Sequence, residues 1–356
     1  MTMPASRSSI TRPSALFLAA MAAAACDPQF EVHNAWAPDP TLPILSKPAH
    51  WLSATPNLDE VLLGYNSTST GNSTLSCMDA AGNYLGSATL PAPWKWGATD
   101  RHPDPSGSGE GPFWAYASTA APGTIFPGVA VLLELNAQCQ ATDLVVVDVP
   151  HESGPGLGRG LAVDPEGRVY LGLSKDIENP YAYLNELWMF DPSTDTWDRA
   201  DDTPPFSGPV VLYGTGPRSD DVNYDPGLDE IVAGIGVLQR RYQPGTMTTL
   251  GTRQLEASAN FPRPSGWDVW WGYTVATREK KNPYFTFIVW DALYLYGTDG
   301  IAMESNDDFW EIRGVDLAAE HVDVDPPYLP FMVYGRSKSR SNEWLPYEVR
   351  LVANPE

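Results

Sequence analysis

The sequence has 356 residues, and 44 acidic residues against 22 lysines and arginines give it a formal net charge of −22 at pH 7. This balance argues against nucleic acid as a partner, because phosphate binding needs a basic surface. The 34 prolines argue against long helices, since proline interrupts helical hydrogen bonding. The composition therefore favours a β-rich fold whose partner is not a nucleic acid.

Residues 1–25 have the features of a secretory signal peptide. Two arginines precede an uncharged apolar stretch over 15–25, which is too short to span a membrane as a helix. The small residues before Cys26 resemble the lipobox of bacterial lipoproteins, although Ala23 stands where Leu is usual. This resemblance implies export and a lipid anchor at Cys26 in the cell envelope. An ordinary secreted protein is the alternative.

Two cysteines remain after Cys26, at positions 77 and 139. An even number of cysteines in an exported protein favours a disulfide, because the compartment is oxidising. We therefore expect Cys77 and Cys139 to be bonded, with two buried free thiols as the alternative.

One sequence pattern, a turn followed by an apolar run and a small closing residue, recurs six times along the chain. Five of the six copies end in glycine. The copies are PNLDEVLLG (56–64), EGPFWAY (110–116), DPEGRVYLG (164–172), DPGLDEIVAG (225–234), WDALYLYG (290–297) and DPPYLPFMVYG (325–335). Such internal repetition is typical of proteins built from equivalent structural units.

A second element follows five of these copies, and it alternates apolar and polar residues about a Gly, Asn, Asp or Pro turn. This alternation is typical of half-buried antiparallel strands. The segments are 74–90, 129–149, 185–200, 237–251 and 308–324. With the apolar stretch before each turn, every unit acquires four strands.

Four short antiparallel strands in each repeated unit describe the blade of a β-propeller. We therefore predict an all-β fold with six four-stranded blades, and five or seven blades are alternatives. The sixth unit stops after its third strand, PYEVRLV (346–352), and FEVHNAW (30–36) precedes the first unit. This N-terminal segment is expected to supply the missing outer strand and close the ring, which protects the sheet edges. The predicted domains are a signal peptide over 1–25, a lipidated linker with the ring-closing strand over 26–48, and the propeller over 49–356.

Two stretches resemble known propeller repeats. GLAVDPEGRVYLG (160–172) is similar to the repeats of NHL, SMP-30 and streptogramin-lyase type propellers, and NELWMFDPSTDTW (185–197) is similar to a kelch hairpin. The matched residues form a turn and a strand pair. The resemblance therefore implies the fold and carries over no functional residue.

The long loops of the predicted propeller lie on one face. If the strands of a blade are A to D from the centre outward, the B–C loops and D–A connections share this face, which we call the loop-rich face. The predicted loops of this face are 66–73, 90–110, 150–160, 175–184, 203–221, 257–285 and 336–343. Binding residues concentrate in such loops on a rigid scaffold.

Four arginines are expected in connections that lead into a first strand: Arg101, Arg159, Arg218 and Arg263. In a closed ring they could converge at the channel mouth. A guanidinium binds carboxylate or phosphate through two parallel hydrogen bonds, so we predict an anionic group there. The alternative is that these arginines pair with neighbouring acids.

Tryptophans in two of the long loops could form a stacking platform for a sugar or another flat ligand: Trp94, Trp96, Trp267, Trp270 and Trp271. Of these, Trp96 and Trp270 are the predicted ligand-binding residues. Packing between blades is the alternative, because aromatic residues dominate core burial. Four further tryptophans fall in predicted strands and are expected to pack: Trp114, Trp188, Trp290 and Trp310.

Candidates for catalysis are few. His102, His151 and Glu152 fall in loops of the loop-rich face and would serve as acid–base residues. The sequence contains no G-x-S-x-G, H-E-x-x-H or P-loop motif. No cofactor or metal site is predicted, and a calcium ion held in the channel by side chains of separate blades stays open as an alternative.

The leading hypothesis is a monomeric, membrane-anchored, extracytoplasmic β-propeller without catalytic activity. Its loop-rich face would bind a small molecule, a glycan or an envelope protein. One rival is a propeller hydrolase or lyase that acts on a small molecule or glycan through His102 and His151. The other is a structural component of the envelope whose channel mouth is plugged by its own loops.

Overall fold

The computed structural model describes most of the strands and their turns. The described residues are 29–35, 51–54, 60–66, 72–79, 83–101, 113–119, 130–136, 138–148, 157–176, 183–200, 220–235, 238–256, 264–270, 272–281, 288–317, 328–339 and 344–352. Within them every regular element is a β-strand. No helix in this part of the chain has the length and apolar character needed to cross a membrane.

The described strands form six four-stranded antiparallel sheets. The first three sheets contain β2 (Trp51–Ala54), β3 (Glu60–Asn66), β4 (Ser73–Asp79) and β5 (Tyr84–Leu90); β6 (Lys95–Arg101), β7 (Phe113–Ser118), β8 (Ala130–Leu135) and β9 (Ala141–Asp148); and β10 (Leu157–Val163), β11 (Val169–Asp176), β12 (Tyr183–Asp191) and β13 (Thr196–Arg199). The next two contain β14 (Asp220–Asp225), β15 (Glu230–Ile235), β16 (Leu238–Tyr242) and β17 (Thr249–Gln254); and β18 (Pro264–Trp270), β19 (Tyr273–Lys281), β20 (Ile288–Tyr296) and β21 (Ala302–Asn306). The last sheet contains β22 (Phe309–Leu317), β23 (Tyr328–Ser337), β24 (Leu345–Val352) and β1 (Gln29–Ala35).

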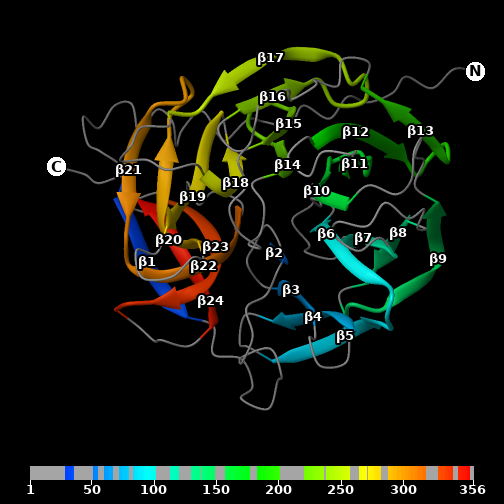
Figure 1. The fold of residues 1–356 in the computed structure, drawn as a ribbon, viewed down its shortest axis with the longest axis horizontal. Helices are drawn as coiled ribbons and strands as arrows, with labels where there is room; N and C mark the ends of the chain where they lie inside the picture. Colours follow the sequence, from blue (N-terminus) through cyan, green and yellow to red (C-terminus); the bar gives the residue numbers. More distant parts are fainter. Residues whose placement is uncertain are drawn as a thin grey trace, which may run out of the picture.

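The sheets are arranged around a common centre, as Figure 1 shows. The first strand of each sheet contacts the first strand of the next, from β2 through β6, β10, β14 and β18 to β22. Strand β22 in turn contacts β2, so the series of contacts returns to its start. The protein is therefore an all-β propeller, as the sequence predicts.

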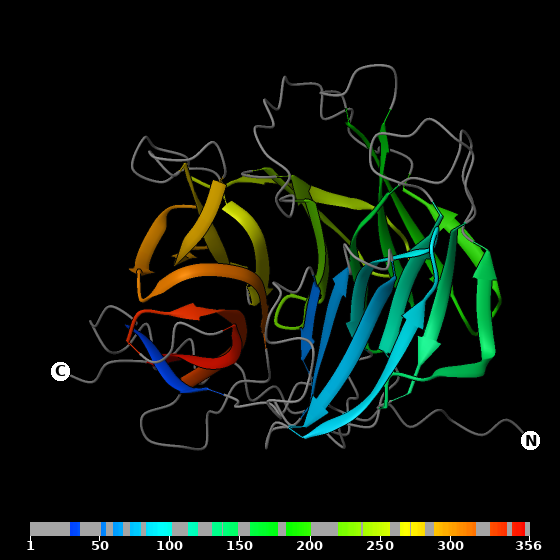
Figure 2. The ribbon, with the colours of Figure 1, turned by 60° about the horizontal axis from the view of Figure 1, so that its bottom comes forward.

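The last sheet joins the two ends of the described chain. Strand β1 pairs antiparallel with β24, from Gln29 opposite Val352 to Ala35 opposite Tyr347. The rings of Phe30 and Phe331 pack edge to face with centroids 5.7 Å apart. In Figures 1 and 2 the dark blue β1 lies beside the red β24. The pairing expected of residues 30–36 is thus observed.

The turn between β10 and β11 has a buried aspartate at its centre. Asp164 is fully buried, and its Oδ1 accepts hydrogen bonds from the backbone N–H groups of Glu166 and Arg168 at 3.1 and 2.9 Å. Gly167 has a φ of 82°, a conformation that glycine adopts without steric cost. The Tyr170 hydroxyl donates to Asp164 Oδ2 at 2.8 Å. The Asp-Pro-Glu-Gly segment therefore fixes this hairpin through its own side chains.

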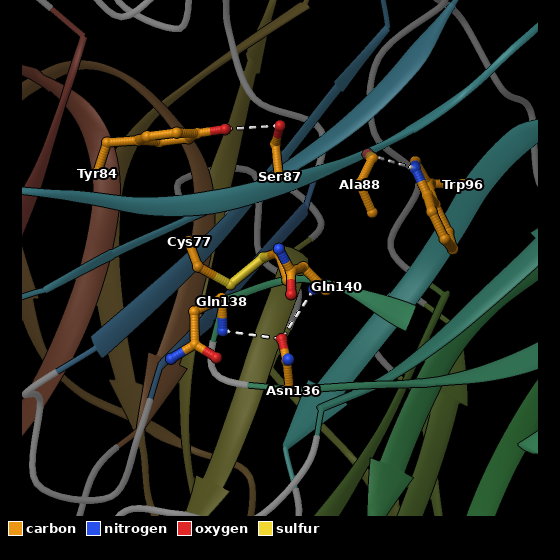
Figure 3. Close-up of a disulfide and its surroundings, with 9 residues drawn as sticks. Cys77, Tyr84, Ser87, Ala88, Trp96, Asn136, Gln138 and Gln140 are labelled. Carbon is orange, nitrogen blue, oxygen red and sulfur yellow. Dashed lines mark hydrogen bonds between the residues drawn. A yellow bond between two sulfur atoms is a disulfide. The ribbon is translucent and has the colours of Figure 1, made fainter. Parts of the chain in front are cut away.

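Turns between third and fourth strands contact the preceding sheet. The Gly245 N–H donates to the Tyr170 hydroxyl at 2.8 Å, which joins the β16–β17 turn to the third sheet. The β8–β9 turn is joined to the first sheet covalently, by a disulfide between Cys77 of β4 and Cys139 (Figure 3). A Cβ on Gly86 would come within 2.1 Å of the Gln138 carbonyl oxygen. The hydrogen bond, the disulfide and this close approach of Gln138 to Gly86 join neighbouring sheets.

Three assignments of loops and repeats were wrong. The predicted loop over 257–285 contains β18 and β19, so the run over 290–297 is a third strand and not a second one. The predicted hairpin over 308–324 contains β22, the first strand of the last sheet. The predicted loop over 90–110 contains β6. The misassigned first strands are polar or glycine-containing and lack the apolar run that marks the second strands.

Candidate binding surface on the last sheet

One end of the last sheet carries an exposed cluster of aromatic and charged side chains. It is formed by the connection from β21 to β22, the start of β22, the end of β23 and the residue before β24. These are a D–A connection and a B–C loop, so the cluster lies on the loop-rich face. We call it the Trp310 surface and define it as Asp307, Asp308, Trp310, Glu311, Arg336, Lys338, Ser339 and Trp344.

Trp310 is turned outward by an irregularity in β22. Phe309 pairs with Ser337 and Glu311 pairs with Arg336, so Trp310 is an extra residue with no opposite partner. Such a bulge redirects a side chain relative to a regular strand. Phe309 and Glu311 are 0% and 8% exposed, whereas Trp310 is 55% exposed. The indole is therefore presented to solvent by a strand whose neighbouring residues are anchored.

Lys338 lies against this ring. Its Nζ is over the Trp310 ring, 5.5 Å from the centroid, within the range of a cation–π contact. The same Nζ donates a hydrogen bond to the Asp307 carbonyl oxygen and lies 4.0 Å from the Asp307 carboxylate. The Asp307 side chain is 87% exposed. The lysine is thus held between the ring and the D–A connection.

Asp308 ties the D–A connection to the end of β23. Its Oδ2 accepts hydrogen bonds from the hydroxyls of Ser337 and Ser339 at 2.8 and 2.6 Å. Its carbonyl oxygen accepts from the Lys338 N–H at 2.5 Å. The Asn306 side chain in turn accepts from the Asp308 N–H at 3.0 Å. The polar side of the surface is therefore fixed by hydrogen bonds.

A second cation and ring lie at the same end of the sheet. The Arg336 guanidinium is 5.4 Å from the centroid of Trp344, and the Trp344 ring stacks on buried Tyr334 at 5.6 Å. Arg336 Nη2 also donates to Glu311 Oε2 at 3.2 Å. Burial raises the pKa of Tyr334 above its usual value, so this tyrosine stays neutral. The pair extends the Trp310 surface toward β24.

The surface is acidic despite its two cations. Lys338 and Arg336 both have acidic neighbours, and Asp308 adds a third carboxylate. An exposed indole among carboxylate and hydroxyl oxygens provides an apolar face with hydrogen-bond acceptors at its edge. Chemically, such a surface can bind a ligand that has an apolar face and hydrogen-bond donors.

Trp96 was predicted as a ligand-binding residue, and this prediction was wrong. It lies in β6, where it is 3% exposed and packs in the cluster that contains both bridged cysteines. Its Nε1 donates to the Ala88 carbonyl oxygen at 3.3 Å (Figure 3). Residues 95–101 form a first strand in place of a loop, so alternate side chains point into the core. Trp96 therefore has a packing role.

The prediction that four arginines converge at the channel mouth is wrong for Arg101. Arg101 is the last residue of β6 and pairs with Phe113, which places it at the A–B end, away from the loop-rich face. Arg159 lies near the start of β10, in a bulge between Gly158 and Gly160. Arg218 and Arg263 lie outside the described residues, and the side chain of Arg159 is not described either.

The remaining predicted site residues cannot be placed in a described environment. His102, His151, Glu152 and Cys26 lie outside the described residues, as does the side chain of Trp270 in β18. Among the described side chains, no group of three or more His, Cys, Asp or Glu residues could hold a metal ion.

Trp310 is the residue that sequence reasoning missed. Its place in a predicted strand indicated packing, whereas the structure leaves its side chain 55% exposed at the bulge. Phe309 and Trp310 are adjacent, and neighbouring strand residues point to opposite faces. Both faces of a sheet can be buried here, as adjacent Phe113 and Trp114 of β7 are at 0% and 3% exposure, so alternation alone gave no signal that Trp310 is exposed.

Comparisons with known proteins add little to this description. The chain matches no protein-family model, and it has no significant similarity to curated proteins. Two solved structures have a similar arrangement of strands at 11% sequence identity. One is a protein of unknown function from Bacteroides caccae, with a TM-score of 0.49 over 82% of this chain and 98% of that one. The other is Kuenenia stuttgartiensis hydrazine synthase, with a TM-score of 0.44 over 81% of this chain and 76% of that one. Neither similarity bears on function.

Proposed function

We propose that the protein is a lipid-anchored, extracytoplasmic β-propeller that binds a ligand or protein partner through its loop-rich face. The Trp310 surface is the part of that face that carries the proposal. Trp310 is a large aromatic side chain that is 55% exposed, although its neighbours in the strand, Phe309 and Glu311, are buried. Tryptophan is also strongly enriched among residues that dominate binding energy.

The proposed propeller has six blades, one for each four-stranded sheet. The closed series of contacts between first strands supports this number. The resemblance of residues 160–172 to NHL-type repeats is supported only to the extent of the β10–β11 hairpin and its buried Asp164.

The proposed lipid anchor is compatible with this binding face. Strand β1 begins at Gln29, shortly after Cys26, and Gln29 pairs with Val352 at the far end of β24 from Trp344. A chain advances at most about 3.6 Å per residue. A lipid on Cys26 would therefore hold the end of the last sheet that contains Gln29 and Val352 near the membrane. The Trp310 surface, at the other end of the sheet, would be directed away from the membrane.

Two further ideas stay predictions. An anionic group could still meet Arg159, Arg218 and Arg263, whose side chains are not described. The rival enzymatic function depends on His102 and His151, and no described cluster of side chains supports it.

The anchor is tested by mass spectrometry of the N-terminal peptide of the protein purified from membranes. We expect cleavage before Cys26 and a diacylglyceryl group on its sulfur. Cys26→Ser should remove the lipid and accumulate at the size of the precursor. An unmodified cysteine in a processed chain would contradict the anchor.

The binding face is tested by photo-crosslinking in the producing cells. A benzoylphenylalanine placed at position 310 should give a discrete adduct. The same photoreactive residue at position 84 is the matched control, because Tyr84 is also an exposed aromatic, at 45%, on the outer strand of another sheet. No adduct at 310, or equal adducts at both positions, would reject this face as the binding site.

A further inference from the structure

The backbone that carries Trp310 is anchored on both sides. Its neighbours Phe309 and Glu311 are buried, and the bulge sets the direction of the side chain. Binding to an ordered side chain avoids much of the entropy cost of fixing it. This favours a ligand that needs a flat, fixed platform.

Among the described residues, one cation lies over the Trp310 ring. This cation is Lys338 Nζ, and the Asp307 carbonyl holds the ammonium group in place. With this contact made, Trp310 is still 55% exposed. A ligand can therefore stack on the exposed part of the indole without displacing the lysine.

The charges around the ring disfavour an anionic ligand. Each cation already faces an acid, Arg336 with Glu311 at 3.2 Å and Lys338 with Asp307 at 4.0 Å. Asp308 makes the surface net negative, and the whole chain carries a net charge of −22. An anion would meet like charge on approach and would have to compete with these ion pairs.

The hydrogen-bonding groups around the ring suit a ligand with several hydroxyl groups. The Asp307 carboxylate is 87% exposed and can accept hydrogen bonds. The next residue, Asp308, accepts a hydrogen bond from the Ser339 hydroxyl at 2.6 Å. A sugar ring has an apolar face of C–H groups and hydroxyl donors at its edge, which matches an indole bordered by carboxylates.

We propose that the Trp310 surface binds a neutral saccharide. One sugar ring stacks on the exposed part of Trp310, and its hydroxyls donate to the Asp307 carboxylate and to Ser339. This rests on the proposed function and names the ligand class for that site.

Affinity electrophoresis of the purified protein in nonionic detergent tests the ligand class. Native gels contain dextran, β-glucan, xyloglucan or arabinogalactan as neutral polysaccharides, and polygalacturonate or alginate as acidic ones. We expect at least one neutral polysaccharide to retard the protein, with little change at high salt because no charge is neutralised. Trp310→Ala should raise the apparent dissociation constant at least about tenfold, the equivalent of about 1.4 kcal/mol.

Two variants make the result specific. Trp310→Phe should retain part of the affinity, because a smaller aromatic face remains. Tyr84→Ala should have no effect.

Three results would overturn the proposal that the Trp310 surface binds a neutral saccharide. They are the absence of retardation in all four neutral gels, retardation confined to the acidic polysaccharides, and retardation that salt abolishes. If position 310 still gives a protein adduct in cells, the face binds a protein and only the ligand class is wrong. If neither retardation nor an adduct occurs, both proposals fail.

Discussion

The ammonium group of Lys338 lies 5.5 Å from the ring centroid of Trp310, on a surface where the ring is still more than half exposed. Trp96, at 3% exposure, has the opposite environment. Trp96 was predicted to bind and is buried, whereas Trp310 was predicted to pack and is exposed, so their substitutions should separate binding from stability.

We predict that Trp96→Ala lowers the free energy of unfolding by about 3–5 kcal/mol, since it leaves a cavity in the cluster around Cys77 and Cys139. Trp310→Ala should change it by less than about 1 kcal/mol, because little buried area is lost. Guanidinium unfolding followed by circular dichroism measures both. Equal losses in the two variants would contradict the assigned environments.

The disulfide should stabilise the protein across two sheets. It closes a segment with a sequence separation of 62 residues, for which the loss of unfolded-state entropy corresponds to about 4 kcal/mol. The double variant Cys77→Ser, Cys139→Ser should therefore unfold at lower denaturant concentration. Reductant should shift the wild-type midpoint toward that of the variant and leave the variant itself unchanged. A wild-type midpoint that does not respond to reductant in the unfolding transition would argue against the bond.

The strands that could be predicted from the sequence are those that carry a run of apolar residues. Second strands that carry apolar runs, such as β11 and β23, were located correctly, whereas the second strand β19 lacks such a run and was taken for a loop. First strands such as β6 and β18 contain glycine, proline or charges and were also taken for loops. The site depended on the β22 bulge, and a bulge arises from backbone pairing that alternation in the sequence does not encode.

Asp164 should be essential for the β10–β11 turn. It is fully buried, and its Oδ2 lies 2.6 Å from Arg168 Nε. We predict that Asp164→Asn costs about 2–3 kcal/mol, because the amide leaves a charged partner and one buried hydrogen bond unsatisfied. Thermal unfolding measures the loss.

The matched control is Asp191→Asn in the exposed β12–β13 turn. Asp191 accepts hydrogen bonds from the Ser193 N–H and hydroxyl at 2.8 and 2.6 Å, and these lower its pKa. Because water can replace these contacts, the cost should stay below about 1 kcal/mol. A similar loss in both variants would show that burial of Asp164 is not the cause.

Alkaline pH should destabilise the fold through its buried tyrosines. Burial raises the pKa of Tyr170, Tyr224 and Tyr296 well above the usual value of about 10. In the unfolded chain these phenols lose their protons first. Their contribution to stability is therefore complete below about pH 10 and is lost as the pH rises toward the higher folded-state pKa values. Absorbance at 295 nm should show a late group of tyrosines that titrate only together with loss of circular dichroism. A single early titration of all 16 tyrosines with the fold intact would contradict this.

The pairing of β1 with β24 can be tested as binding of a synthetic β1 peptide to a protein that lacks this strand. Removing residues 27–37 exposes the backbone of β24, and an uncovered edge strand favours self-association. We predict a lower midpoint of thermal unfolding and the appearance of oligomers in size-exclusion chromatography. A synthetic peptide of residues 27–37 should bind the truncated protein by adding a strand and restore the monomer. Its Phe30→Glu version should not, because Phe30 packs on Phe331 with ring centroids 5.7 Å apart. If both peptides restore the monomer equally, backbone pairing alone holds the last sheet together and the aromatic contact adds nothing to it. If neither binds, β1 is not the strand that completes the ring.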